Sequence, residues 1–296
     1  MNHIIFKNLL HFDIKLWVEK NIASLPNSFE RIMKRYELGK GDYENSILAD
    51  MVFSRLGWVN VSKDIKNSFW GTFTCALVKL SEENNWTYSS ASRNKCTDSM
   101  YSFDNDYNIM YCSWNPDTER WGKFPLSKKK FGEKISSSKN IHQEKIPTLL
   151  KEFPEFRELS NICDSIANFM PCPDYPFNSV KGCLDDVKDY LNLMIDKIQN
   201  CIDTNQNLIY YIGENQEEIK LEKVSEWKEW FIKNQKVYHL TDYYFIENEK
   251  IVGKPLFENQ SLLYPMPLEK EEIRNCVKET IKRINNRANS ISNDLK

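Results

Sequence analysis

The sequence predicts an α+β protein, with an antiparallel sheet in its N-terminal half and a mainly helical C-terminal half. Between Gly57 and Phe124, aromatic and β-branched residues gather in short runs that turn residues separate, which is typical of strands. After residue 146, apolar residues recur every three or four positions, which is typical of helices with one buried face. Between these strands no helical pattern is long enough for a parallel crossover, so the strands are expected to be antiparallel.

Composition bounds the size and the class of the protein. The chain has 296 residues, of which 41% are hydrophobic and 28% are charged, so it is long enough to bury a core as one large domain or two smaller ones. Its formal charge of −2 argues against a strongly basic DNA-binding protein and against a strongly acidic DNA mimic. A local charged patch is compatible with this balance.

The N-terminal segment and the cysteines indicate a cytoplasmic protein. Lys7, His11 and Asp13 interrupt the apolar residues at the N-terminus, so no signal peptide is expected. No apolar run reaches the length of about eighteen residues that a membrane span needs. The eight cysteines lie in a long chain rich in lysine and asparagine, so we expect them to be reduced and mostly buried.

Three regions follow from the patterns along the chain. Residues 1–125 form an α+β region with the antiparallel sheet, and residues 146–296 form a mainly helical region. Between them, residues 126–145 are rich in lysine and serine, which predicts an exposed linker or loop. The lysines at 128–130 have few aromatic neighbours, so a solvated loop is favoured over a phosphate-binding one.

Within the sheet region, the sequence predicts the structure of two segments in particular. Residues 68–80 predict one long strand with a bulge at Gly71, and residues 107–124 predict a hairpin that turns at Asn115–Asp117.

In the C-terminal region, a proline-rich segment at 171–176 predicts a stiff hinge between two helices. The expected elements there are helices over 146–170, 184–202, 217–233 and 269–292, a strand over 207–212, and an extended segment over 237–246 that turns back at 248–250.

The sharpest enzymatic pattern combines Asp174 with Asp186 and Lys188. Metal-dependent nucleases use two carboxylates to hold Mg²⁺ and a lysine to position the attacking water. That mechanism needs the second carboxylate and the lysine on one side of a strand, whereas Asp186 and Lys188 lie in a helical pattern where residues two apart diverge. A hinge aspartate beside a solvated helix is the alternative, and it is favoured.

Other candidate sites have still less support, so no cofactor or metal is expected. Asp104–Asn108 begins like a calcium-binding loop, but Ile109 replaces the required glycine and Asn115 replaces the closing glutamate. The cysteines at 163, 172, 183 and 201 lack the spacing of a zinc site. His239, in an aromatic run, could orient a nucleophile, although a structural histidine is favoured.

Aromatic residues carry more information about function. The chain has eight tryptophans, fourteen tyrosines and sixteen phenylalanines. Aromatic side chains offer a large contact area at a small entropic loss and are enriched at the centres of protein interfaces. Many of them fill the core, and those that remain on the surface favour a protein that holds another protein.

The order of several segments resembles that of proteins from Gram-positive bacteria and their phages. The segments concerned are Ile166–Pro171, Phe177-Asn178, Lys181-Gly182, Asp189–Leu193, Trp227–Phe231 and Leu262–Pro265, followed by a closing helix. In size and composition the chain is also similar to the phage-encoded inhibitors of the Gabija defence system.

This resemblance implies a non-enzymatic protein. Such an inhibitor binds the nuclease–helicase complex of Gabija, forms a homo-oligomer around it and blocks its DNA binding or cleavage. The resemblance assigns no interface residue, and it implies neither direct nucleic-acid binding nor membrane contact. The alternative is a Mg²⁺-dependent nuclease or phosphodiesterase that uses Asp174, Asp186 and Lys188.

Overall fold

The structure is a computed structural model. It describes residues 52–58, 62–65, 100–103, 109–115, 120–125, 148–162, 165–177, 180, 191–212, 215–263 and 267–296, together with Thr72, Cys75, Ala76, Lys79, Leu80, Glu83 and Asn84.

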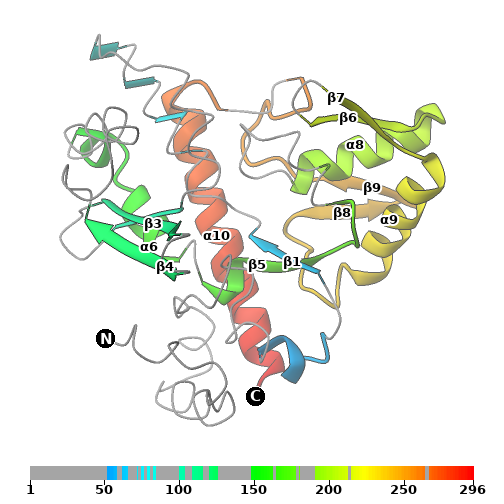
Figure 1. Cartoon of the computed structure of the whole chain (residues 1–296), viewed down its shortest axis with the longest axis horizontal. Coiled ribbons are helices and arrows are strands. Elements are labelled where there is room, and N and C mark those ends of the chain that lie inside the picture. The colour runs from blue at the N-terminus through cyan, green and yellow to red at the C-terminus, as the bar shows by residue number, and fades with distance from the viewer. Residues whose placement is uncertain are drawn as a thin grey trace.

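The long C-terminal helix α10, Lys270–Asp294, is the axis of the fold. Figure 1 shows it running down the middle of the molecule, with β3, β4 and α6 on one side and α8, α9 and the β8–β9 hairpin on the other. Its predicted apolar face is confirmed, because the following residues are all buried: Ile273, Val277, Ile281, Ile284, Ala288 and Ile291. A reciprocal capping box between Glu269 and Glu272 sets the start of the helix.

On one side of α10, helices and hairpins alternate along the chain. The elements are α8 (Leu191–Thr204), the hairpin of β6 (Leu208–Ile212) and β7 (Asn215–Ile219), α9 (Leu221–Asn234), and the hairpin of β8 (Tyr244–Glu247) and β9 (Lys250–Gly253). The strand predicted over 207–212 is confirmed. The helix predicted from 217 begins instead at Leu221, because residues 215–219 pair with β6.

The extended segment predicted over 237–246 is only partly right. Residues 236–243 form turns, and the strand begins at Tyr244. The predicted turn at 248–250 is confirmed, since Asn248 and Glu249 adopt φ angles of 49° and 62° and Lys250 pairs with Glu247.

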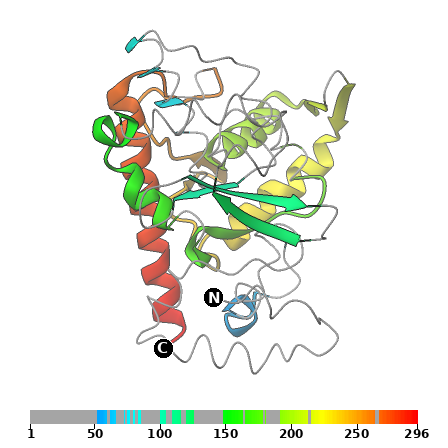
Figure 2. The same cartoon turned by 60° about the vertical axis from the view of Figure 1, so that its left-hand side comes forward.

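The N-terminal half contains a three-stranded antiparallel sheet in the order β2-β3-β4 (Met100–Phe103, Ile109–Asn115, Arg120–Pro125). The predicted hairpin over 107–124 and the α+β class are therefore confirmed. Figure 2 shows β3 and β4 as two long adjacent arrows crossing in front of the molecule, with α10 along one side.

The strand predicted over 68–80 is wrong. Every described residue of that segment is helical: Thr72, Cys75, Ala76, Lys79 and Leu80. Cys75, Ala76 and Leu80 are buried, at a spacing that fits one side of a helix. The described residues of this segment are therefore helical, although its aromatic and β-branched content predicts a strand.

The proline-rich segment 171–176 does not join two helices directly: its first two residues end a buried strand, and residues 173–176 form a loop. The preceding helix α6, Phe156–Ile162, ends eight residues earlier than predicted, and a 3₁₀ turn leads into β5, Phe169–Cys172. β5 pairs with β1, Ser62–Ile65, in an antiparallel two-stranded sheet. Proline disfavours helix and suits an edge strand, which explains why the helix stops before Pro171.

One continuous core joins the parts of the chain. Val52, Phe53 and Trp58 are buried in the same cluster as residues from β5, α8, α9 and α10. β1 belongs to the predicted N-terminal region and β5 to the C-terminal one, while the linker predicted at 126–145 lies outside the described residues. The boundary between the two regions therefore stays a prediction.

Candidate protein-binding surface

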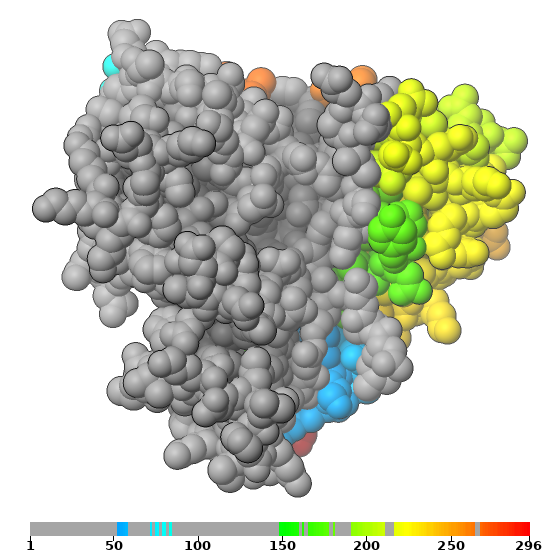
Figure 3. Space-filling model, in the orientation of Figure 1, coloured from blue at the N-terminus to red at the C-terminus, as the bar shows by residue number. Residues whose placement is uncertain are grey.

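The chain leaves the buried strand β5 through a short projection, residues 173–177, which we call the Tyr175 loop. Pro171, Cys172 and Pro173 are buried, and the backbone then reaches the surface. Tyr175 is 81% exposed, the largest exposure of any described aromatic side chain. In Figure 3, green atoms from this part of the chain come to the surface beside the yellow atoms of α9.

The C-terminal end of the Tyr175 loop is anchored by a buried aromatic residue. Phe177 is 1% exposed, and its ring lies edge-on to Trp227 at 5.4 Å and tilted against Phe231 at 5.7 Å. The backbone closes a turn where the N–H of Phe177 donates to the carbonyl of Asp174 at 3.2 Å. The peptide bond between Tyr175 and Pro176 is cis.

These contacts fix the backbone on both sides of Tyr175 while leaving its side chain in water. Proline removes backbone freedom before and after it, and Phe177 holds the loop against α9. An aromatic side chain loses little entropy when a partner covers it, since it has only two side-chain torsions. The arrangement suits a contact point for another protein.

A second exposed apolar segment was not predicted as a surface. Leu262, Leu263 and Leu268, which we call the leucine loop residues, are 37%, 98% and 51% exposed and lie between β9 and α10. This connection is the orange trace near the top of Figure 1. The sequence offered no signal for their exposure, because leucine is more often buried.

Both ends of the leucine segment are held in place. On the β9 side, Gln260 accepts hydrogen bonds from the Asn192 side chain at 2.6 Å and from the Leu256 N–H at 2.7 Å. On the α10 side, Pro267 is buried, and the Leu268 N–H donates to Glu272 at 3.1 Å.

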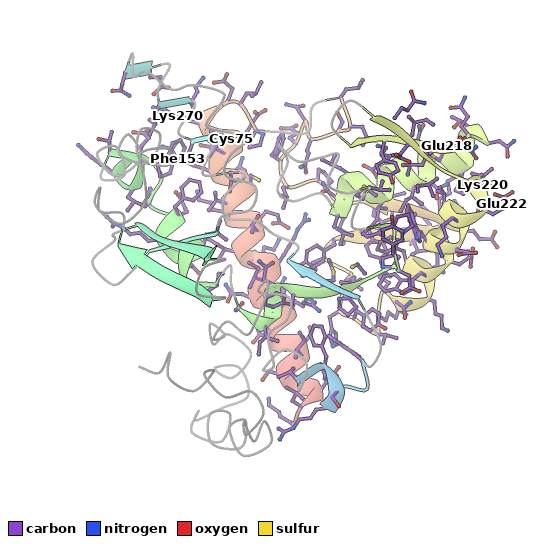
Figure 4. The ribbon with its side chains drawn as sticks, viewed as in Figure 1. Cys75, Phe153, Glu218, Lys220, Glu222 and Lys270 are labelled. Carbon is purple, nitrogen blue, oxygen red and sulfur yellow. The ribbon has the colours of Figure 1, made fainter. Side chains whose placement is uncertain are left out.

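Ion pairs tie the start of α10 to segments far away in the sequence. Lys270 pairs with Glu83 at 2.6 Å and with Glu152 at 3.1 Å. The guanidinium of Arg274 also reaches Glu152 and lies 5.4 Å from the centre of the Phe153 ring. Figure 4 shows Lys270 and Phe153 at the same end of α10. The hydrogen bond from Lys270 lowers the pKa of Glu152, which keeps this carboxylate ionised.

The nuclease candidates are only partly described. Asp174 is exposed in the Tyr175 loop, while Asp186 and Lys188 lie outside the described residues. The structure therefore does not test whether the three side chains meet. Among the described residues, no group of three or more histidine, cysteine, aspartate or glutamate side chains could hold a metal ion.

The remaining candidate residues either lie outside the described residues or are buried or bonded within the fold. The calcium-like segment 104–108 and the cysteines at 163 and 183 lie outside the described residues. Cys172 and Cys201 are buried, and burial raises the pKa of the Cys201 thiol. His239 lies 2.8 Å from Asp294 near the end of α10, with a φ angle of 55° and its ring beside Trp58.

Comparison with known proteins identifies no relative of this chain. A scan against protein-family models and searches of curated proteins and of solved structures found no match for the chain. No described helix is long and apolar enough to cross a bilayer.

Proposed function

We propose that this protein acts by binding another protein and blocking it, without catalysing a reaction. The observation that carries the proposal is Tyr175, an aromatic side chain 81% exposed on a loop that is anchored at both ends. Water would be excluded from this ring only by a partner. The leucine loop residues provide a second apolar contact surface of the same kind.

The partner that we propose is the Gabija nuclease–helicase complex of a bacterial host. This choice rests on the resemblance of the chain to phage-encoded Gabija inhibitors, and the exposed apolar groups are compatible with it. In this proposal the protein works in the host cytoplasm, assembles as a homo-oligomer around the complex and prevents it from binding or cleaving DNA.

The expected energetics follow from the position of Tyr175. A hot-spot residue of an interface costs about 2 kcal/mol or more when truncated to alanine, and tyrosine is enriched among such residues. Because the loop is already fixed by Phe177 and the flanking prolines, little further ordering is needed on binding. Tyr175 should therefore affect affinity more than an equally accessible residue in a less constrained setting.

The experiment measures binding of the purified protein to the purified Gabija complex, and DNA cleavage by that complex. Tyr175→Ala should weaken binding by about thirtyfold or more and restore cleavage. Val237→Ala is the matched control, because Val237 is an apolar residue, 50% exposed, in the turn after α9. It should bind and inhibit like the parent protein.

Two outcomes would contradict the proposal. If the parent protein neither binds the complex nor lowers its DNA cleavage, the proposed partner is wrong. If Tyr175→Ala and Val237→Ala inhibit equally well, the Tyr175 loop is not the contact surface. The mass of the assembly in solution, alone and with the complex, tests the proposed homo-oligomer separately.

A further inference from the structure

The β8–β9 hairpin has a register that determines which backbone groups point away from it. Asn248 and Glu249 form a two-residue turn with positive φ angles, so Glu247 and Lys250 are a hydrogen-bonded pair. Pairs then alternate along the ladder. Ile246 and Ile251 therefore form a pair whose N–H and C=O groups point outward, away from the partner strand.

The outer edge of β9 is closed by side chains of α8. The N–H of Ile251 donates to the side-chain oxygen of Gln199 at 3.0 Å. The N–H of Gly253 donates to the carboxylate of Asp196 at 2.8 Å. These bonds agree with the register, because both N–H groups belong to pairs that do not bond across the hairpin. No further strand can add on this side of the sheet.

The outer edge of β8 is different. The carbonyl of Tyr244 accepts a hydrogen bond from the Gln235 side chain at 2.7 Å, which closes the first position. At the next outward position, the N–H and C=O of Ile246 have no hydrogen-bond partner in the described part of the chain. The side chains of Phe245 and Ile246 are 39% and 37% exposed there. β8 therefore presents an open backbone edge with apolar side chains on it.

Charge around this edge favours one kind of occupant. Glu247 and Glu249 are exposed and have no ion-pair partner among the described residues, whereas Lys250 is paired with Asp203 at 2.9 Å. Phe245 and Glu247 lie on the same face of β8, two residues apart. A strand with an aliphatic residue opposite Phe245 and a basic residue opposite Glu247 would complement both.

We propose that the open edge of β8 binds an extended segment of another protein in which aliphatic and basic residues alternate on one face. The segment would add a strand to the hairpin through the N–H and C=O of Ile246. A second copy of this chain is the less suitable occupant, because it would bring a second pair of unpaired glutamates to the same edge. This edge is made of other residues than the Tyr175 loop, and the inference does not depend on the proposed function.

The test uses the full-length protein and a fluorescein-labelled peptide, Lys-Thr-Val-Thr-Lys-Thr-Val, in a fluorescence anisotropy titration. Lysine and valine lie on one face of this peptide when it is extended. Ile246→Pro removes the outward N–H, which takes no part in the ladder with β9, together with the isoleucine side chain, and it should weaken binding about fivefold or more. Ile246→Val keeps the N–H and should bind like the parent protein.

Further probes separate backbone pairing from charge attraction. A peptide with glutamate in place of lysine should bind at least about tenfold more weakly. A peptide N-methylated on its threonines keeps its charge but loses the N–H groups that would face Ile246, and it should also bind more weakly. Circular dichroism and thermal unfolding establish that Ile246→Pro is folded.

Three results would overturn the inference. The first is the absence of saturable binding by the lysine peptide. The second is equal binding to the parent protein and to a folded Ile246→Pro variant. The third is a dimer in sedimentation equilibrium that Ile246→Pro dissociates, since the occupant would then be a second copy. If Ile246→Pro does not fold, weaker binding of the N-methylated peptide decides in favour of the inference, and unchanged binding decides against it.

Discussion

Gly253 of β9 lies directly against the backbone of Asn192 in α8. A Cβ atom added at Gly253 would lie 2.9 Å from the Cα of Asn192 and closer still to its carbonyl oxygen. These are backbone atoms that cannot rotate away. The pairing of α8 with β9 therefore requires glycine at this position for its close approach.

Gly253→Ala should lower the free energy of unfolding by about 2 kcal/mol or more, because the methyl group forces α8 and β9 apart. Urea denaturation measures this loss. Gly57→Ala is the comparison, since its Cβ would meet nothing within 4 Å but its φ of 75° is strained for alanine. That change should cost about 1 kcal/mol. Equal losses in the two variants would contradict the close packing at Gly253.

Arg287 joins three parts of the core, and its removal should be severe. It is 2% exposed and donates hydrogen bonds to the carbonyls of Ala167, Phe169 and Tyr238. Burial lowers its pKa to about 10, so the guanidinium remains charged at neutral pH. Arg287→Ala leaves buried carbonyls without donors and should cost about 3 kcal/mol or more.

Chemical denaturation of Arg287→Ala and Arg287→Lys would measure this effect. Lysine cannot reproduce the several N–H donors of the planar guanidinium, so Arg287→Lys should recover only part of the lost stability. Lys282→Ala, at the exposed residue just before Arg283 in α10, should change stability by less than about 0.5 kcal/mol. A loss below 1 kcal/mol for Arg287→Ala would mean that the three carbonyls find other donors.

The partly buried carboxyl group of Asp196 leads to a prediction about how stability depends on pH. Its partial burial raises its pKa, and the N–H of Gly253 opposes this shift. A carboxyl group whose folded pKa lies above its unfolded pKa stabilises the fold at low pH and loses that contribution as the pH rises through the folded pKa. Asp196→Asn retains the acceptor for Gly253 and should be more stable than the parent at pH 7, by about 0.5 kcal/mol or more.

The stability advantage of Asp196→Asn should disappear below about pH 4, because the parent carboxyl is then protonated and, like asparagine, uncharged. Asp203→Asn is the control with the opposite sign. A hydrogen bond from Lys250 lowers the pKa of Asp203, so its contribution is present at neutral pH and is lost as the pH falls. Thermal unfolding across this range compares the variants, and a constant advantage at every pH would contradict the assignment.

The alternative nuclease function gives a direct biochemical prediction. If the protein acts only by binding, the parent protein and Asp174→Asn should both leave DNA and RNA intact in Mg²⁺. Gel electrophoresis of the nucleic acid measures this. Cleavage by the parent protein that disappears in Asp174→Asn would support the nuclease and would contradict the binding proposal.

The helices with clear periodicity could be predicted from the sequence. The apolar face of α10 was correct residue by residue, because this helix packs along its length and its burial follows its 3.6-residue repeat. The β3–β4 and β8–β9 hairpins were predicted because their turns leave a local signal in asparagine and proline, whereas the β6–β7 hairpin was not predicted.

The errors have a common physical cause, which is that burial hides the periodicity. Residues 68–80 were read as a strand because aromatic residues dominate, although Cys75, Ala76 and Leu80 are buried on a helix. β5 was read as helix and hinge because Phe169 and Met170 continue an apolar run. Its partner β1 is far away in the sequence, so no local pattern reveals the pairing.

The candidate surfaces were only partly predictable. The surplus of aromatic residues indicated contact surfaces in general, and the prolines around Tyr175 indicated a stiff segment. The exposure of Leu263 and the open edge at Ile246 depend on which tertiary neighbours are present, and the sequence alone does not contain that information.

The pairing of β1 with β5 also has a consequence for biosynthesis. About a hundred residues of chain must leave the ribosome after Ile65 before Phe169 is available to bond with it. Until then β1 lacks its partner strand, and Arg287, which lies over the indole of the neighbouring Trp58, is synthesised later still. The nascent chain therefore completes this part of its interior only after Arg287 has left the ribosome.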